Sequence, residues 1–86
     1  MTNMTFSKYK YKPDDFKGIQ FMADDLAAFY RSFETYRKEK AKSAWWELKD
    51  HWENLFFTIK HRELEGFLTQ NTADDMRNYL EELADA

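Results

Sequence analysis

The two histidines are the residues best suited to proton transfer or metal binding. His51 follows Glu47 by four positions and Glu65 follows His61 by four, so on a helix each pair shares one face. A protein metal site needs three or four converging ligands, and the chain has no cysteine to supply one. We therefore expect surface pairs, with no metal site and no cofactor.

Four pairs of adjacent acids are the next candidates for acid–base chemistry: Asp14-Asp15, Asp24-Asp25, Asp74-Asp75 and Glu81-Glu82. Neighbouring side chains on a helix point about 100° apart, so a doublet does not by itself form two acids facing one cleft. We interpret the doublets as helix starts and solvated faces. The sequence thus predicts a protein that is not an enzyme.

A short run near the N-terminus alternates basic and aromatic residues: Lys8, Tyr9, Lys10, Tyr11 and Lys12. Lysine can pair with phosphates and tyrosine can stack on bases, which is how many proteins bind single-stranded nucleic acid. The chain carries a net charge of −3, however, whereas nucleic-acid-binding domains usually have a dominant basic face. A nucleic-acid-binding accessory protein is therefore our alternative function. The period of two also predicts that residues 1–12 form an extended or flexible arm, which either lies on the helices or is disordered.

Length and composition limit the architecture. The chain has 86 residues, enough for one domain, and its 19% aromatic content can build a core without disulfides. Only two glycines and one proline interrupt a sequence rich in helix-forming residues. The longest apolar run is five residues, at 26–30, so we expect no membrane contact and a small acidic protein of the cytoplasm.

Two apolar stripes at helical spacing predict two long helices, over about 19–40 and 44–65. The first stripe is Ile19, Met22, Leu26, Phe29, Phe33 and Tyr36, and the second is Trp45, Leu48, Trp52, Leu55, Phe56 and Ile59. The stripes are out of register, which favours a break near residues 40–43 with Ser43 as the N-cap. One continuous helix is the alternative, because neither glycine nor proline marks the turn.

The end of the chain predicts a third, shorter helix over about 73–85. Gly66 fits the position that ends the second helix, and Thr72 with Asp75 resembles a capping box that opens the third. The fold class is therefore all-α: an antiparallel hairpin plus a C-terminal helix in a small three-helix bundle. In this organisation the arm covers 1–12 and a single helical domain covers 13–86.

The second helix has more apolar surface than one core contact requires. Trp46, Phe57 and Leu64 cluster on a face well away from its main stripe. Either the third helix, the arm or Phe67-Leu68 covers this face, or it binds another chain. We predict a non-catalytic, regulatory protein-binding module that modulates a larger partner or self-associates as a homodimer. The residues expected to steer a basic partner are the acids of the third helix: Asp74, Asp75, Glu81 and Glu82.

Overall fold

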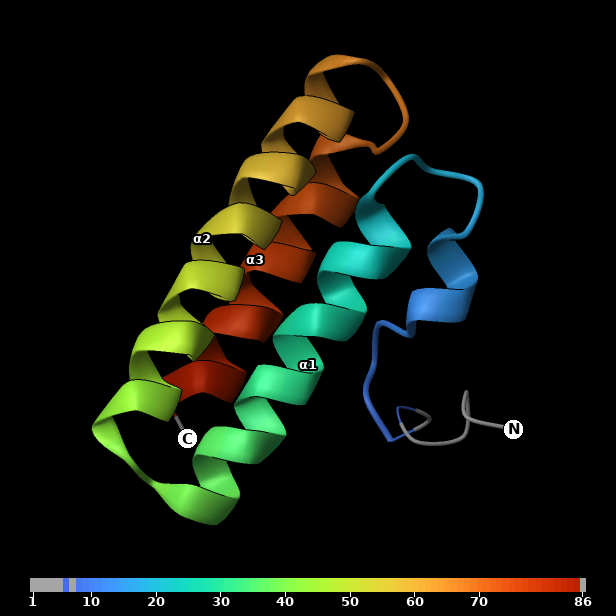
Figure 1. Cartoon of the computed structure of the whole chain (residues 1–86). Coiled ribbons are helices and arrows are strands. Elements are labelled where there is room, and N and C mark those ends of the chain that lie inside the picture. Colours follow the sequence, from blue (N-terminus) through green and yellow to red (C-terminus); the bar gives the residue numbers. More distant parts are fainter. Residues whose placement is uncertain (1–5, 7, 86) are drawn as a thin grey trace.

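A computed structural model describes residues 6 and 8–85 of the chain. Its elements are a 3-10 helix η2 (Pro13–Phe16) and three α-helices, α1 (Met22–Glu39), α2 (Lys42–Leu64) and α3 (Gln70–Asp85). Helices α1 and α2 form an antiparallel hairpin, and α3 runs back beside α2 (Figure 1). The predicted all-α three-helix bundle is confirmed. Residues 1–5 and 7 of the predicted arm, and Ala86, lie outside the described residues.

The core lies along the line where the three helices meet. Each helix contributes the apolar side chains of one stripe, because residues three and four apart fall on the same face. The side chains with no exposed surface are Met22, Leu26, Phe29, Tyr30, Leu55, Ile59, Ala73, Met76 and Leu80. Helices α1 and α2 pack closely along their length, and α3 packs less closely against them.

The hairpin turn lies at Lys40 and Ala41, which confirms the predicted break between the first two helices. Lys40 adopts a left-handed conformation with φ of 52°, and its N–H donates to the Tyr36 carbonyl at 2.7 Å. This conformation ends α1 without the glycine that usually occupies such a position. The prediction of Ser43 as the N-cap is wrong, because α2 begins at Lys42 after Ala41, with no capping side chain.

Gly66 ends α2 as predicted. Its φ of 90° is open to glycine and strained for other residues. The N–H of Phe67 donates to the Arg62 carbonyl at 2.9 Å, and that of Gly66 donates to the Glu63 carbonyl at 3.1 Å. These two bonds form a Schellman motif.

The predicted start of the third helix is three residues too late. Helix α3 begins at Gln70, and the side-chain oxygen of Thr69 accepts the Thr72 N–H at 3.1 Å. Thr69 is therefore the N-cap, and Thr72 lies in the first turn. Both threonines have a hydroxyl that can cap a helix, so the sequence does not distinguish them, and Thr69 is the one that caps α3.

Residues 8–12 do not run as a strand but bend over the helices, which is one of the two alternatives for the arm. The Tyr9 side chain is only 4% exposed, and its ring stacks on Tyr30 of α1 at 3.9 Å between centroids. Its hydroxyl donates to Glu34 at 2.9 Å. The backbone N–H of Lys10 donates to the Tyr79 hydroxyl of α3 at 3.0 Å. This part of the arm is therefore built into the fold.

Within residues 6 and 8–85, no helix has both the length and the apolar character needed to cross a membrane.

Candidate protein-binding surface

Trp46, Phe57 and Leu64 project from the side of α2 opposite its core residues. Their side chains are 51%, 66% and 74% exposed, respectively. In a three-helix bundle two sides of each helix contact neighbours and the third faces outward, and at about 100° per residue these positions share the outward side. With this exposure they are covered neither by α3, nor by the described part of the arm, nor by Phe67, which is itself exposed, and Leu68, which is buried in the core. We call the row that includes the charged residues between them the outer face of α2: Trp46, Asp50, Glu53, Phe57, Lys60 and Leu64.

Trp45 corrects the sequence-based assignment, which placed it in the core stripe. It is 40% exposed, and its ring meets that of Trp46 edge to face, with 4.9 Å between centroids. The Lys49 ammonium lies 5.7 Å from the Trp45 ring and 5.5 Å from the Trp46 ring, within range of cation–π attraction. The helical period had assigned only Trp46 to the outward side, whereas both neighbouring tryptophans are exposed.

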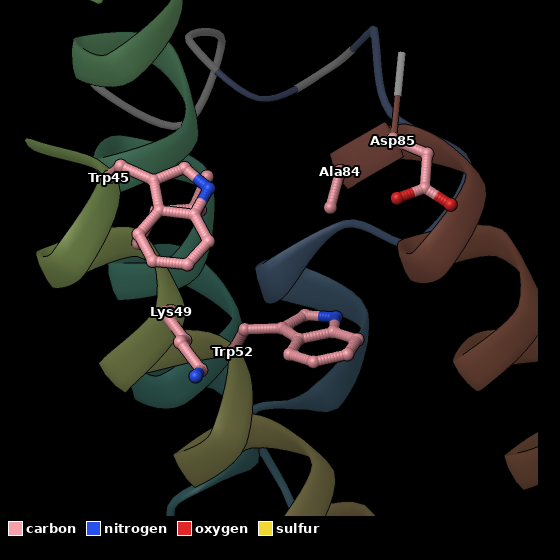
Figure 2. Close-up of a pocket in the computed structure, with 6 residues that line it drawn as sticks. Trp45, Lys49, Trp52, Ala84 and Asp85 are labelled. Atoms are coloured by element: carbon pink, nitrogen blue, oxygen red, sulfur yellow. The ribbon is translucent and has the colours of Figure 1, made fainter. Parts of the chain in front are cut away.

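A hollow separates the beginning of α2 from the end of α3. Trp45, Lys49 and Trp52 project from α2 on one side, and Ala84 and Asp85 lie on α3 across from them (Figure 2). Its volume is about 230 Å³. The hollow lies between α2 and α3, which pack less closely than α1 and α2 do, and two tryptophans line it.

Trp52 connects this hollow to the outer face of α2. It is partly buried against the core, and a second, shallower hollow runs from it past Phe56 to Phe57 and Lys60. Its indole N–H is buried and has no acceptor among the described residues. An unpaired buried donor costs about 1–3 kcal/mol. We call this continuous set the α2 aromatic surface: Trp45, Trp46, Trp52, Phe56 and Phe57.

Of the four acids of α3 predicted to steer a partner, Asp74 and Asp75 form ion pairs with other described residues, whereas Glu81 and Glu82 do not. Asp74 binds Arg77 at 2.5 Å, and Arg77 also reaches Glu63 of α2 at 3.2 Å, so this group joins two helices. Asp75 accepts hydrogen bonds from Lys10 and Tyr11, which lower the pKa of its carboxyl group. In contrast, Glu81 and Glu82 are exposed and form no ion pair with another described residue.

The residues of the nucleic-acid alternative are occupied by contacts within the chain. Tyr9 is stacked on Tyr30, and Tyr11 packs edge to face against Tyr79. Burial, followed by the hydrogen bond to Asp75, raises the pKa of Tyr11 to about 12. Burial is also the main cause of the raised pKa values of Tyr9 and Tyr30.

The three lysines of the arm differ in their contacts. Lys8 pairs with Glu34 at 3.2 Å and Lys10 with Asp75 at 2.7 Å. Lys12 is half-buried and forms no ion pair within residues 6 and 8–85. Because Tyr9 stacks on Tyr30 and Tyr11 packs against Tyr79, base stacking on this arm would require both tyrosines to give up these contacts.

Neither predicted histidine–glutamate pair forms an ion pair among the described residues. The His61 ring lies 4.4 Å from the Phe57 ring between centroids, and Glu65 pairs with Arg62 instead. Neither His51 nor Glu47 forms an ion pair within the described ranges. No three His, Asp or Glu side chains in the same ranges gather closely enough to hold a metal ion.

Comparisons of the chain with family models, curated proteins and solved structures give no significant match.

Proposed function

We propose that this protein is a non-catalytic interaction module that binds protein through the α2 aromatic surface and the outer face of α2. The observation that carries the proposal is the exposure of Trp45, Trp46, Phe57 and Leu64 on one helix. An 86-residue chain needs most of its large apolar side chains for its core. Four large apolar side chains of α2 nevertheless remain exposed and do not contribute fully to the core.

Binding energy at protein interfaces is concentrated in a few aromatic anchors, with tryptophan prominent among them. Trp45 and Trp46 contact each other, and Lys49 lies close to both rings. These contacts restrict the two rings before a partner arrives, which lowers the entropy lost on binding. A truncated tryptophan anchor typically costs about 2 kcal/mol or more of binding free energy.

The partner is another protein, whose activity this module would regulate, or a second copy of the chain. Glu81 and Glu82 add negative charge that would speed encounter with a basic partner. We propose the cytoplasm as the compartment in which this binding takes place. The nucleic-acid alternative has less support, because Tyr9 and Tyr11 are engaged within the bundle.

Site-specific photo-crosslinking in the cells that naturally produce the protein tests the proposal. A photoreactive phenylalanine analogue replaces Phe57 on the outer face, and the same analogue replaces Arg31, an exposed residue of α1, as the matched control. We expect discrete protein adducts from position 57, fewer from position 31, and a loss of the adducts when Trp46→Ala is added. Equal adduct patterns from positions 57 and 31 would contradict the proposal.

A further inference from the structure

The outer face of α2 has the spacing of a coiled-coil seam. Its six residues, at 46, 50, 53, 57, 60 and 64, follow one another at intervals of four, three, four, three and four. This is the heptad alternation with which two helices pack along a shared seam. All six residues are exposed, and the row spans about 27 Å at 1.5 Å per residue.

The charged residues of the row, Asp50, Glu53 and Lys60, favour one kind of partner helix and one direction for it. We propose, as a refinement that rests on the protein-binding function above, that the occupant of this face is a second copy of the chain, with the two α2 helices antiparallel. This direction places Trp46 opposite the partner's Leu64 and Asp50 opposite the partner's Lys60. It also places Glu53 against the partner's Phe57, so that no like charges meet in the seam.

Parallel, in-register pairing lacks this complementarity. It would place Asp50 and Glu53 against their own copies, and Lys60 against its own copy. An antiparallel pair shifted by one heptad, with Trp46 opposite the partner's Phe57, would place Asp50 against the partner's Glu53. Like charges directly across an interface are unfavourable, so both arrangements are selected against.

The positions that flank the seam support the same register. On one side Lys49 lies opposite the partner's Glu63, a carboxylate that also pairs with Arg77 of its own chain, and Phe56 meets the partner's Phe56 at the twofold axis. On the other side Glu47 lies opposite the partner's His61. Because of the twofold axis, each contact between two different residues occurs twice in the dimer. This register therefore pairs several residues favourably at once.

Within the described part of the chain, Asp50, Glu53 and Lys60 form no ion pair of their own. Their charges are therefore available to a partner without breaking a contact inside the bundle. Three of the six seam positions are charged, which weakens a coiled-coil contact. We expect dissociation constants of about 10–100 μM for a seam of this kind.

A charge exchange tests this pairing. The variants are Asp50→Lys, Lys60→Asp and the double variant, with Glu82→Lys on α3 as a matched charge reversal away from the seam. Circular dichroism establishes that each variant keeps its helices. Molar mass by light scattering is then measured from about 1 μM to about 500 μM, which brackets the expected dissociation constant.

For the wild type and Glu82→Lys, we expect the mass to rise from 10.5 kDa towards twice that value. Each single seam variant should weaken association at least about tenfold, because it creates two like-charge contacts per dimer. The double variant restores both contacts and should return to within about threefold of the wild type. A double variant as weak as the single ones, or a monomeric wild type at every concentration, would overturn the antiparallel pairing.

The two proposals fail in distinguishable ways. A monomeric wild type with crosslinks from position 57 to a different protein would overturn self-pairing and leave the protein-binding function standing. A monomeric wild type whose adducts from position 57 match those from position 31 would overturn both.

Discussion

Replacing Tyr9 by alanine tests whether the described part of the N-terminal arm belongs to the fold. Tyr9 is 4% exposed, its ring stacks on Tyr30 at 3.9 Å, and its hydroxyl binds Glu34 at 2.9 Å. Truncation of a large buried aromatic residue costs about 3–5 kcal/mol. We take about 3 kcal/mol for Tyr9→Ala, the lower end of this range. For a domain of this size that corresponds to a fall in Tm of roughly 12–24 °C.

Two companion variants separate the contributions of Tyr9. Tyr9→Phe keeps the stacked ring and loses the hydroxyl, so it should cost about 1 kcal/mol. Lys8→Ala removes a largely exposed ion pair with Glu34 and should cost less than about 1 kcal/mol. Thermal unfolding followed by circular dichroism measures all three. A Tyr9→Ala protein that melts within about 3 °C of the wild type would refute the packing of the arm, because its loss would be below 1 kcal/mol.

The remaining predictions concern helix ends and pH, each measured by urea unfolding. Gly66→Ala should lower stability by about 1 kcal/mol, whereas Lys40→Gly should raise it by about 0.5–1 kcal/mol, because both positions have left-handed backbones. A gain in stability for Gly66→Ala, or a loss for Lys40→Gly, would contradict the left-handed backbone at that position. Thr69→Ala should cost about 1 kcal/mol and Ser43→Ala almost nothing, and the reverse order would restore Ser43 as a cap. The raised pKa of Tyr11, about 12, means that the folded chain holds a proton that the unfolded chain loses above its ordinary value of 10. The contribution of Tyr11 to stability should therefore be present below about pH 10 and be lost between about 10 and about 12, so that stability falls over that interval; a rise there would contradict it.

The three helices and the end of α2 follow from local patterns that the sequence displays directly. The stripes that contain Leu26 and Leu55 repeat at helical spacing, and Gly66 has the conformational freedom that a left-handed position requires. Lys40 is different, because it adopts the same left-handed conformation without a residue type that marks it. The change of register between stripes was thus the only available signal of the turn.

Tertiary packing decides the features that the sequence did not reveal. The wheel position of Trp45 is compatible with the core, and its exposure depends on how closely α3 approaches the start of α2. The burial of Tyr9 likewise requires Tyr30 and Glu34, which lie more than twenty residues away in the chain. In contrast, the helical period alone places Trp46 and Phe57 on one face away from the core stripe, and the packing of the bundle leaves that face exposed.

On our proposal, the outward apolar side chains of α2 are not needed for folding and serve binding. The most direct measurement is the free energy of unfolding of Trp46→Ala beside Leu55→Ala, at a chain concentration of about 1 μM, where mass action suppresses weak self-association. We predict a loss below about 1 kcal/mol for Trp46→Ala, since Trp46 is 51% exposed, and a loss of about 2–5 kcal/mol for the fully buried Leu55. A loss for Trp46→Ala as large as that for Leu55→Ala would contradict the claim, because Trp46 would then belong to the core.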